Sequence, residues 1–205
     1  MCSNPIFVVG YMHSGTTMLV NILGEHPDVW RVKGETRFFS HAPLYRLRYP
    51  NLENDDTLRD LIHTLASGIK WSGADMVRDE TGIKRDQLDA IFDSVKLTRE
   101  YATVFRAVFD HMSRSAGCAR WTEKTPTHIF HISEILEAIP DAYFVEIVRD
   151  PRDVLASKKT RRASIWTTER YTSTQRPMKA LALAYDPFWD YSVVEIGHSS
   201  GTEST

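Results

Sequence analysis

The sequence predicts an α/β fold of three layers, in which helices cover both faces of a mainly parallel central sheet. Two short apolar runs, residues 5–10 and 142–148, have the composition of strands buried on both faces. A segment with helical spacing follows each run, and strands that alternate with helices are typical of parallel sheets. The length of 205 residues suits one large domain with a substantial core.

The other elements follow from periodicity and from chain breakers. Apolar residues three and four positions apart indicate helices, which we expect at residues 16–24, 58–65, 101–112, 129–139 and 150–162. Residues 29–32 indicate a brief strand, and residues 121–126 the end of another that runs into a loop. Residues 42–56 are rich in Pro, Asn, Asp and Tyr and are expected to form a loop or insertion.

Composition excludes several classes of protein. The formal net charge of -2 argues against a generally basic protein that coats nucleic acid. Cys2 and Cys118 make no disulfide framework and have no metal-ligand spacing, so we expect a reducing compartment and no metal site. Without a signal-peptide pattern or a long apolar run, a cytoplasmic location without a membrane span is expected. We expect one domain over residues 1–186 and an atypical, flexible tail over residues 187–205.

The first candidate site is the segment GYMHSGTT, residues 10–17, which joins an apolar strand to a helix. A tight turn there directs backbone N–H groups and the positive end of the helix at one point, which suits phosphate or sulfate. The glycine spacing resembles a Walker loop, but Thr16 replaces the lysine of ATP and GTP hydrolases. A turn without a ligand is the alternative. The candidate ligand-binding residues are His13, Ser14, Gly15, Thr16 and Thr17.

The second candidate site follows the apolar run 142–148. Arg149 is expected at the carboxyl end of that strand, the edge at which open α/β sheets bind ligands. Ser157 follows on the next helix, and a guanidinium with a hydroxyl is a suitable receptor for a terminal phosphate. Alternatively, Arg149 pairs with Asp150 or Asp153. We expect the remaining basic residues to lie on a solvated helix face: Arg152, Lys159, Arg161 and Arg162.

Together the two segments resemble the sulfotransferases that use 3'-phosphoadenosine 5'-phosphosulfate (PAPS), which have a P-loop-type fold. The resemblance implies that the N-terminal loop holds the 5'-phosphosulfate, and that Arg149 and Ser157 hold the 3'-phosphate. Residues 26–37 (HPDV followed by GETR) are similar to the tyrosylprotein sulfotransferase segment with the catalytic glutamate, here Glu35. Residues 123–126 (EKTP) are similar to the segment whose lysine, here Lys124, contacts the leaving group.

The resemblance implies transfer of a sulfuryl group from PAPS to a hydroxyl or amine by in-line displacement. Glu35 would act as the base, while Lys124, His13 and the loop N–H groups would stabilise the departing phosphate. As alternatives, Glu35 is an exposed carboxylate paired with Arg37 or Lys33, and Lys124 is a surface lysine.

Two features depart from the family pattern. His13 stands where the family usually has Arg or Lys, and the C-terminal part is expected to be short or divergent. The alternatives are therefore a non-catalytic or truncated PAPS-binding protein and, less favoured, a P-loop small-molecule kinase. The acceptor stays open among small molecules, carbohydrates, lipids and peptides. Four aromatic residues lie near Glu35 in the sequence: Trp30, Phe38, Phe39 and Tyr45. We expect them to line an acceptor pocket or, alternatively, to belong to the core.

Overall fold

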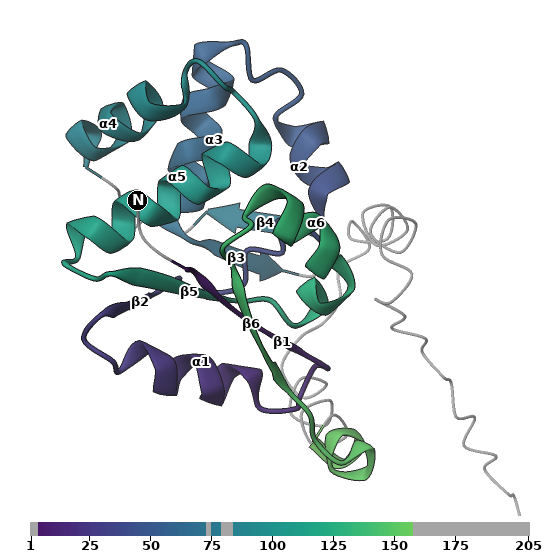
Figure 1. The fold of residues 1–205 in the computed structure, drawn as a ribbon. Coiled ribbons are helices and arrows are strands. Elements are labelled where there is room, and N and C mark those ends of the chain that lie inside the picture. The colour runs from purple at the N-terminus through teal and green to yellow at the C-terminus, as the bar shows by residue number, and fades with distance from the viewer. Residues whose placement is uncertain (1–3, 73–74, 79–83, 158–205) are drawn as a thin grey trace, which may run out of the picture.

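The centre of the protein is a sheet of four parallel strands in the order β2-β5-β1-β6 (Figure 1). A computed structural model of the chain describes residues 4–72, 75–78 and 84–157. The strands are β1 (Ile6–Gly10), β2 (Val29–Arg31), β5 (Arg120–Lys124) and β6 (Tyr143–Ile147). The mainly parallel sheet that the apolar runs predict is therefore confirmed.

β1 lies inside the sheet and has neighbours on both edges. Ile6 pairs with Thr122 of β5 on one side and with Tyr143 of β6 on the other. Phe7 and Val8 are fully buried, as expected for a strand covered on both faces. The ring of Phe7 packs with its centroid 5.4 Å from that of Trp121 on β5, which joins the sheet to the helical layer above.

Helices cover both faces of the sheet. In Figure 1, α1 lies beneath the strands, whereas the longer helices lie above them. α5 packs on the upper face through Phe105 and Phe109, whose rings contact that of Trp121 at centroid distances of 5.9 and 5.4 Å. These two residues are four positions apart, as the predicted amphipathic spacing requires. The helices are α1 (Thr16–Gly24), α3 (Asp55–Ser67), α4 (Arg85–Val95), α5 (Tyr101–Ser115) and α6 (Ile132–Ala138).

The structure corrects the expectation of a loop over residues 42–56, because α2 (Ala42–Arg48) lies in this segment. Pro43 lies in the first turn, where its missing N–H group leaves no bond unmade. Tyr45 and Tyr49, four residues apart, bury one face of the segment. The composition of a loop therefore concealed a short helix with a buried aromatic face.

Two further differences concern elements that the periodicity did not separate. β3 (Ile69–Ser72) and β4 (Asp75–Arg78) form an antiparallel hairpin outside the main sheet. The expected helix over residues 129–139 is divided into a 3-10 helix, Pro126–His131, and α6. Residues 151–157 are helical as predicted; the rest of that helix and the tail after residue 186 lie outside the described residues. None of the helices in the described part has the length and apolarity to cross a membrane.

The buried His41, which precedes α2, makes stability depend on pH. Burial, and secondarily the charge of Arg37, lower the pKa of His41 from 6.5 to about 4. The unfolded chain then binds a proton more readily than the folded one. The contribution of neutral His41 to the free energy of unfolding is full above pH 6.5. It is lost as the pH falls towards 4, by about 3 kcal/mol in total.

Urea unfolding of the wild type between pH 7 and pH 4 measures this loss. The His41→Gln variant has no titrating group at this position, so its free energy of unfolding is expected to fall less over the same interval. Equal losses in the two proteins would show that His41 does not govern stability in this range.

Candidate active site

The loop between β1 and α1 has the geometry of an anion-binding turn. Gly10, His13 and Gly15 have positive φ angles of 142°, 68° and 108°, which turn the chain sharply. The Ser14 N–H group donates to the carbonyl of Tyr11 at 3.2 Å. Gly15, which precedes α1, supplies no side-chain cap, and the first turn of α1 has no acidic residue. The N–H groups at the start of α1 are therefore suited to an anion.

The loop hydroxyls differ in exposure. Ser14 and Thr16 are 6% and 4% exposed, whereas Thr17 is exposed and His13 is half-buried. Thr17 is therefore accessible from solvent, whereas Ser14 and Thr16 are almost fully covered by the surrounding protein.

Arg149 joins the two predicted nucleotide segments. It follows β6 directly, and its Nη1 donates to the carbonyl oxygen of His13 at 3.3 Å. Its Nε lies 3.9 Å from Asp153, while Asp150 pairs with Arg152 instead. The side chain of Arg149 is 42% exposed and so is accessible from solvent. Ser157 is half-buried and follows Asp153 by about one helical turn, which places these two residues on one helix face.

The two predicted catalytic residues lie in contact with each other. Lys124 ends β5, and its Nζ forms an ion pair with Oε1 of Glu35. The other carboxylate oxygen of Glu35 lies 3.4 Å from Nε of Arg37. The Lys124 side chain is only 10% exposed, which excludes the alternative of a surface lysine. Glu35 pairs with Arg37, but its side chain is only 28% exposed and it pairs with Lys124 as well, so it is not the exposed carboxylate of the alternative.

Sheet pairing places this ion pair near the loop. Lys124 is the register partner of Val8, two residues before Gly10, on the adjacent strand β1. Because β1, β5 and β6 are parallel, their carboxyl ends lie at one edge of the sheet. Residues from four separate sequence segments therefore gather at this edge.

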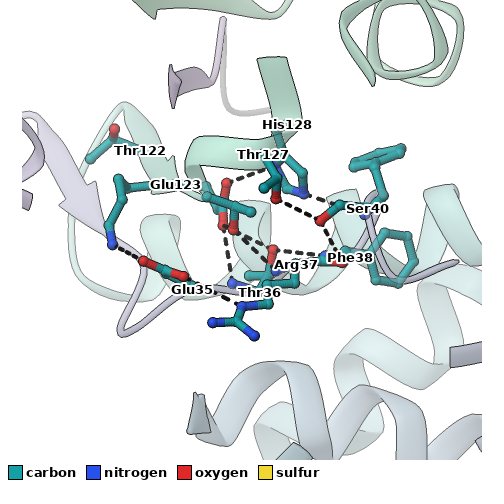
Figure 2. Close-up of polar contacts among 12 residues, drawn as sticks. Glu35, Thr36, Arg37, Phe38, Ser40, Thr122, Glu123, Thr127 and His128 are labelled. Carbon is teal, nitrogen blue, oxygen red and sulfur yellow. Dashed lines mark hydrogen bonds and ion pairs between the residues drawn. The ribbon is translucent and has the colours of Figure 1, made fainter. Parts of the chain in front are cut away.

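Sequence reasoning missed the buried carboxylate of Glu123, which is next to Lys124 but points to the opposite side of β5. Its Oε1 accepts from the Thr36 N–H at 3.1 Å, from the Thr36 hydroxyl at 2.9 Å and from the Thr125 hydroxyl at 2.6 Å. Its Oε2 lies 3.1 Å from Nδ1 of His128 (Figure 2). Glu123 and His128 are both fully buried. The period of two along a strand, which places Glu123 on the same face as Trp121, could have predicted this burial.

These contacts keep Glu123 ionised inside the protein. Burial alone would raise the pKa of Glu123, but the contact with His128 and the hydrogen bonds from Thr125 and Thr36 hold the pKa below its usual value.

Comparison with known proteins gives the family. The model of a family described as "Sulfotransferase family" matches residues 5–193. The chain belongs to the sulfotransferase family. Among solved structures, it is similar to the sulfotransferase STF9 from Mycobacterium avium, with 17% identity and a TM-score of 0.39. That match covers 91% of this chain and 54% of STF9, so the chain spans about half the length of that relative. No curated protein matches the sequence.

The family match confirms the resemblance that the four sequence segments indicate. The roles of individual residues stay predictions. In the described residues, no group of three or more His, Cys, Asp or Glu side chains is arranged to hold a metal ion.

The aromatic residues near Glu35 belong mainly to the core of the protein. Phe38, Phe39 and Tyr45 are 4%, 9% and 1% exposed. They nevertheless form one wall of a cavity of about 400 Å³ beside the start of α5. Trp30 lies beside a different cavity, of about 350 Å³. Glu35 lines neither cavity, so the aromatic residues do not by themselves define an acceptor site.

The turn at Gly10 requires glycine because β6 lies close to it. A Cβ atom at this position would lie 2.6 Å from the carbonyl oxygen of Ile147. We expect Gly10→Ala to reduce the free energy of unfolding by roughly 1–3 kcal/mol more than Gly117→Ala. Gly117 is a matched control because it also has a positive φ, of 75°, while a Cβ there would meet no atom within 4 Å. Urea unfolding of both variants measures the difference, and equal losses would contradict the close approach of β6.

Proposed function

We propose that this sulfotransferase moves the sulfuryl group of PAPS to a hydroxyl or amine acceptor by in-line displacement, with Glu35 as the base. The observation that carries the proposal is the contact between Glu35 and Lys124, which come from separate sequence segments. This contact lies at the carboxyl edge of the sheet, where the strand next to Lys124 continues into the anion-binding turn.

The loop and Arg149 would bind the nucleotide from two sides. The N–H groups at the start of α1, with Ser14, Thr16 and Thr17, suit the 5'-phosphosulfate because they offer donors without a competing acidic side chain. Arg149 and Ser157 would receive the 3'-phosphate. A guanidinium has five N–H donors, so the bond from Arg149 to the His13 carbonyl leaves donors for a phosphate.

Each residue at the ion pair would have a defined task during transfer. Glu35 would take the proton of the acceptor as the acceptor oxygen or nitrogen forms its bond to sulfur. The bond between sulfur and the bridging oxygen breaks in the same step, and its electron pair stays on the departing phosphate. Lys124, His13 and the loop N–H groups would stabilise that negative charge. The ion pair with Lys124 fixes the position of the Glu35 carboxylate at this edge of the sheet.

Calorimetric titration with adenosine 3',5'-bisphosphate, the desulfated product of PAPS, tests the nucleotide site. We expect Arg149→Ala to weaken binding by about 10–100-fold, because a hydrogen-bonded charge is lost. Arg152→Ala is the matched control, since the Arg152 side chain is 90% exposed and pairs with Asp150; its affinity should equal that of the wild type. Tight binding of ATP would favour a kinase, and unchanged binding by Arg149→Ala would contradict the assignment of Arg149.

Turnover with labelled PAPS and a panel of alcohols, sugars, lipids and peptides tests the base. Glu35→Gln is expected to lower kcat by about 10²–10⁴-fold while leaving the affinity for the bisphosphate unchanged. Glu134→Gln is the control, because Glu134 is largely exposed on α6. Wild-type turnover by Glu35→Gln would show that another group takes the proton. Nucleotide binding without any sulfated product would favour the non-catalytic alternative.

A further inference from the structure

The segment after Glu35 is held by side chains and not by a sheet. Four consecutive backbone N–H groups, of residues 36–39, each donate to a side chain at 3.0–3.3 Å. The acceptors, in chain order of the donors, are Glu123 Oε1, Thr125 Oγ1, Thr36 Oγ1 and His128 Nε2. Each of these acceptors is either Glu123 or a residue that is itself hydrogen bonded to Glu123.

Glu123 sets the direction of every hydrogen bond in this group. The hydroxyls of Thr36 and Thr125 both donate to Glu123, which leaves their lone pairs free to accept backbone N–H groups. Nε2 of His128 accepts from the Phe39 N–H, so the ring proton lies on Nδ1 and points at Glu123. The arrangement therefore requires an acceptor at both oxygens of residue 123.

The same group holds a strained backbone. Arg37 has a φ angle of 51°, in the left-handed region, which costs about 1–2 kcal/mol for a residue with a side chain. Its N–H group donates to Thr125, and its neighbour Thr36 is bonded to Glu123 through both backbone and side chain. These bonds offset the strain and hold the chain in the conformation that turns Glu35 towards Lys124.

Two neighbouring contacts join residues 35 and 36 to residues 124 and 123. On one side of β5, Lys124 contacts Glu35. On the other side, Glu123 binds Thr36 (Figure 2). We propose that Glu123 is a positioning residue for the reaction, which sets the place of the base relative to Lys124 through Thr36. This inference rests on the proposed function, because it assumes that Glu35 is the base.

The isosteric variant Glu123→Gln tests the proposal. Its amide NH₂ group is a donor, and it would face another donor, either His128 Nδ1–H or the Thr hydroxyls, so that a hydrogen bond is lost. We expect kcat to fall by up to about 100-fold, as misplacement of a catalytic group by 1 Å does. The KM for PAPS and the affinity for the bisphosphate should stay within about twofold, because residues 123 and 36 are not part of the proposed nucleotide site.

Asp110→Asn is the matched control. Asp110 is 6% exposed and accepts a hydrogen bond from Trp121 Nε1 at 2.8 Å, so the variant also disturbs a buried carboxylate. It should lose stability but keep kcat when assayed under conditions in which urea unfolding shows the protein to be folded. A fall in kcat of equal size in Asp110→Asn would reduce Glu123 to a structural role and overturn the proposal.

A second readout does not depend on turnover. Lys124 is 8% exposed, so its acetylation by acetic anhydride, followed by mass spectrometry, should be slow in the wild type. We expect faster acetylation of Lys124 in Glu123→Gln and no change in Asp110→Asn. If the wild type sulfates no acceptor, the proposed function fails, while the acetylation rates still test whether Glu123 positions the Glu35–Lys124 pair.

Thr125→Val provides the same test in a variant with a milder change. It removes one donor to Glu123 and the acceptor of the Arg37 N–H while preserving the shape of the side chain. Lower kcat with faster acetylation of Lys124 would support the proposal even if Glu123→Gln does not fold. Unchanged kcat and unchanged acetylation in the folded variants would overturn it.

Discussion

The parallel pairing of β1 with β5 and β6 is the constraint on which the rest of this structure depends. Parallel strands end at the same edge, so residues that follow β1, β5 and β6 must meet there whatever the lengths of the connections. His13 and Arg149 are 136 positions apart, yet they share a hydrogen bond. The order and direction of the strands therefore bring the site residues to one edge of the sheet, and the loops adjust only their exact positions.

A second constraint is the charge of Glu123 inside an aromatic core. The rings of Phe7 and Phe39 pack against His128, with centroids 6.0 and 5.5 Å away, and the Glu123 carboxylate beside it is fully buried from bulk solvent. A buried charge of this kind is tolerated only where donors replace its hydration. At this place in the core, hydrogen bonds to Glu123 and to its partners replace apolar contacts, and they specify the conformation of residues 36–39.

The fold was largely predictable from the sequence, because β1, β6 and α5 have apolar patterns that few other structures satisfy. The segment around Tyr45 was not, since its Pro and Asn content is that of a loop. Tyr49 in this segment contacts Thr64 of α3 and Tyr101 of α5, and only the folded chain shows these contacts. The hairpin of β3 and β4 is too short for a periodic signal.

The candidate site was predictable in its residues but not in its geometry. Glu35 and Lys124 stand in recognisable motifs, 89 positions apart, and only the folded chain shows that they touch. The bond from Arg149 to the loop could not be foreseen either, because its acceptor is a backbone carbonyl with no sequence signature. Glu123 was overlooked because a Glu-Lys pair ordinarily indicates a surface. Only the alternation of side chains along β5, which places Glu123 on the same face as Trp121, indicates that it is buried.

The central place of β1 also has a kinetic consequence. Ile6 and Thr122 are hydrogen bonded across a sequence separation of 116 residues, and β6 follows later still. Such non-local pairing is slow to form, since the entropy of closing a long loop is lost before the contacts are gained. During synthesis, the apolar segment 6–9 leaves the ribosome long before either neighbour exists, and it stays a site for aggregation until they arrive. Of the four strands in this sheet, β1 is synthesised before the others, and its pairing is complete only once β6 is available.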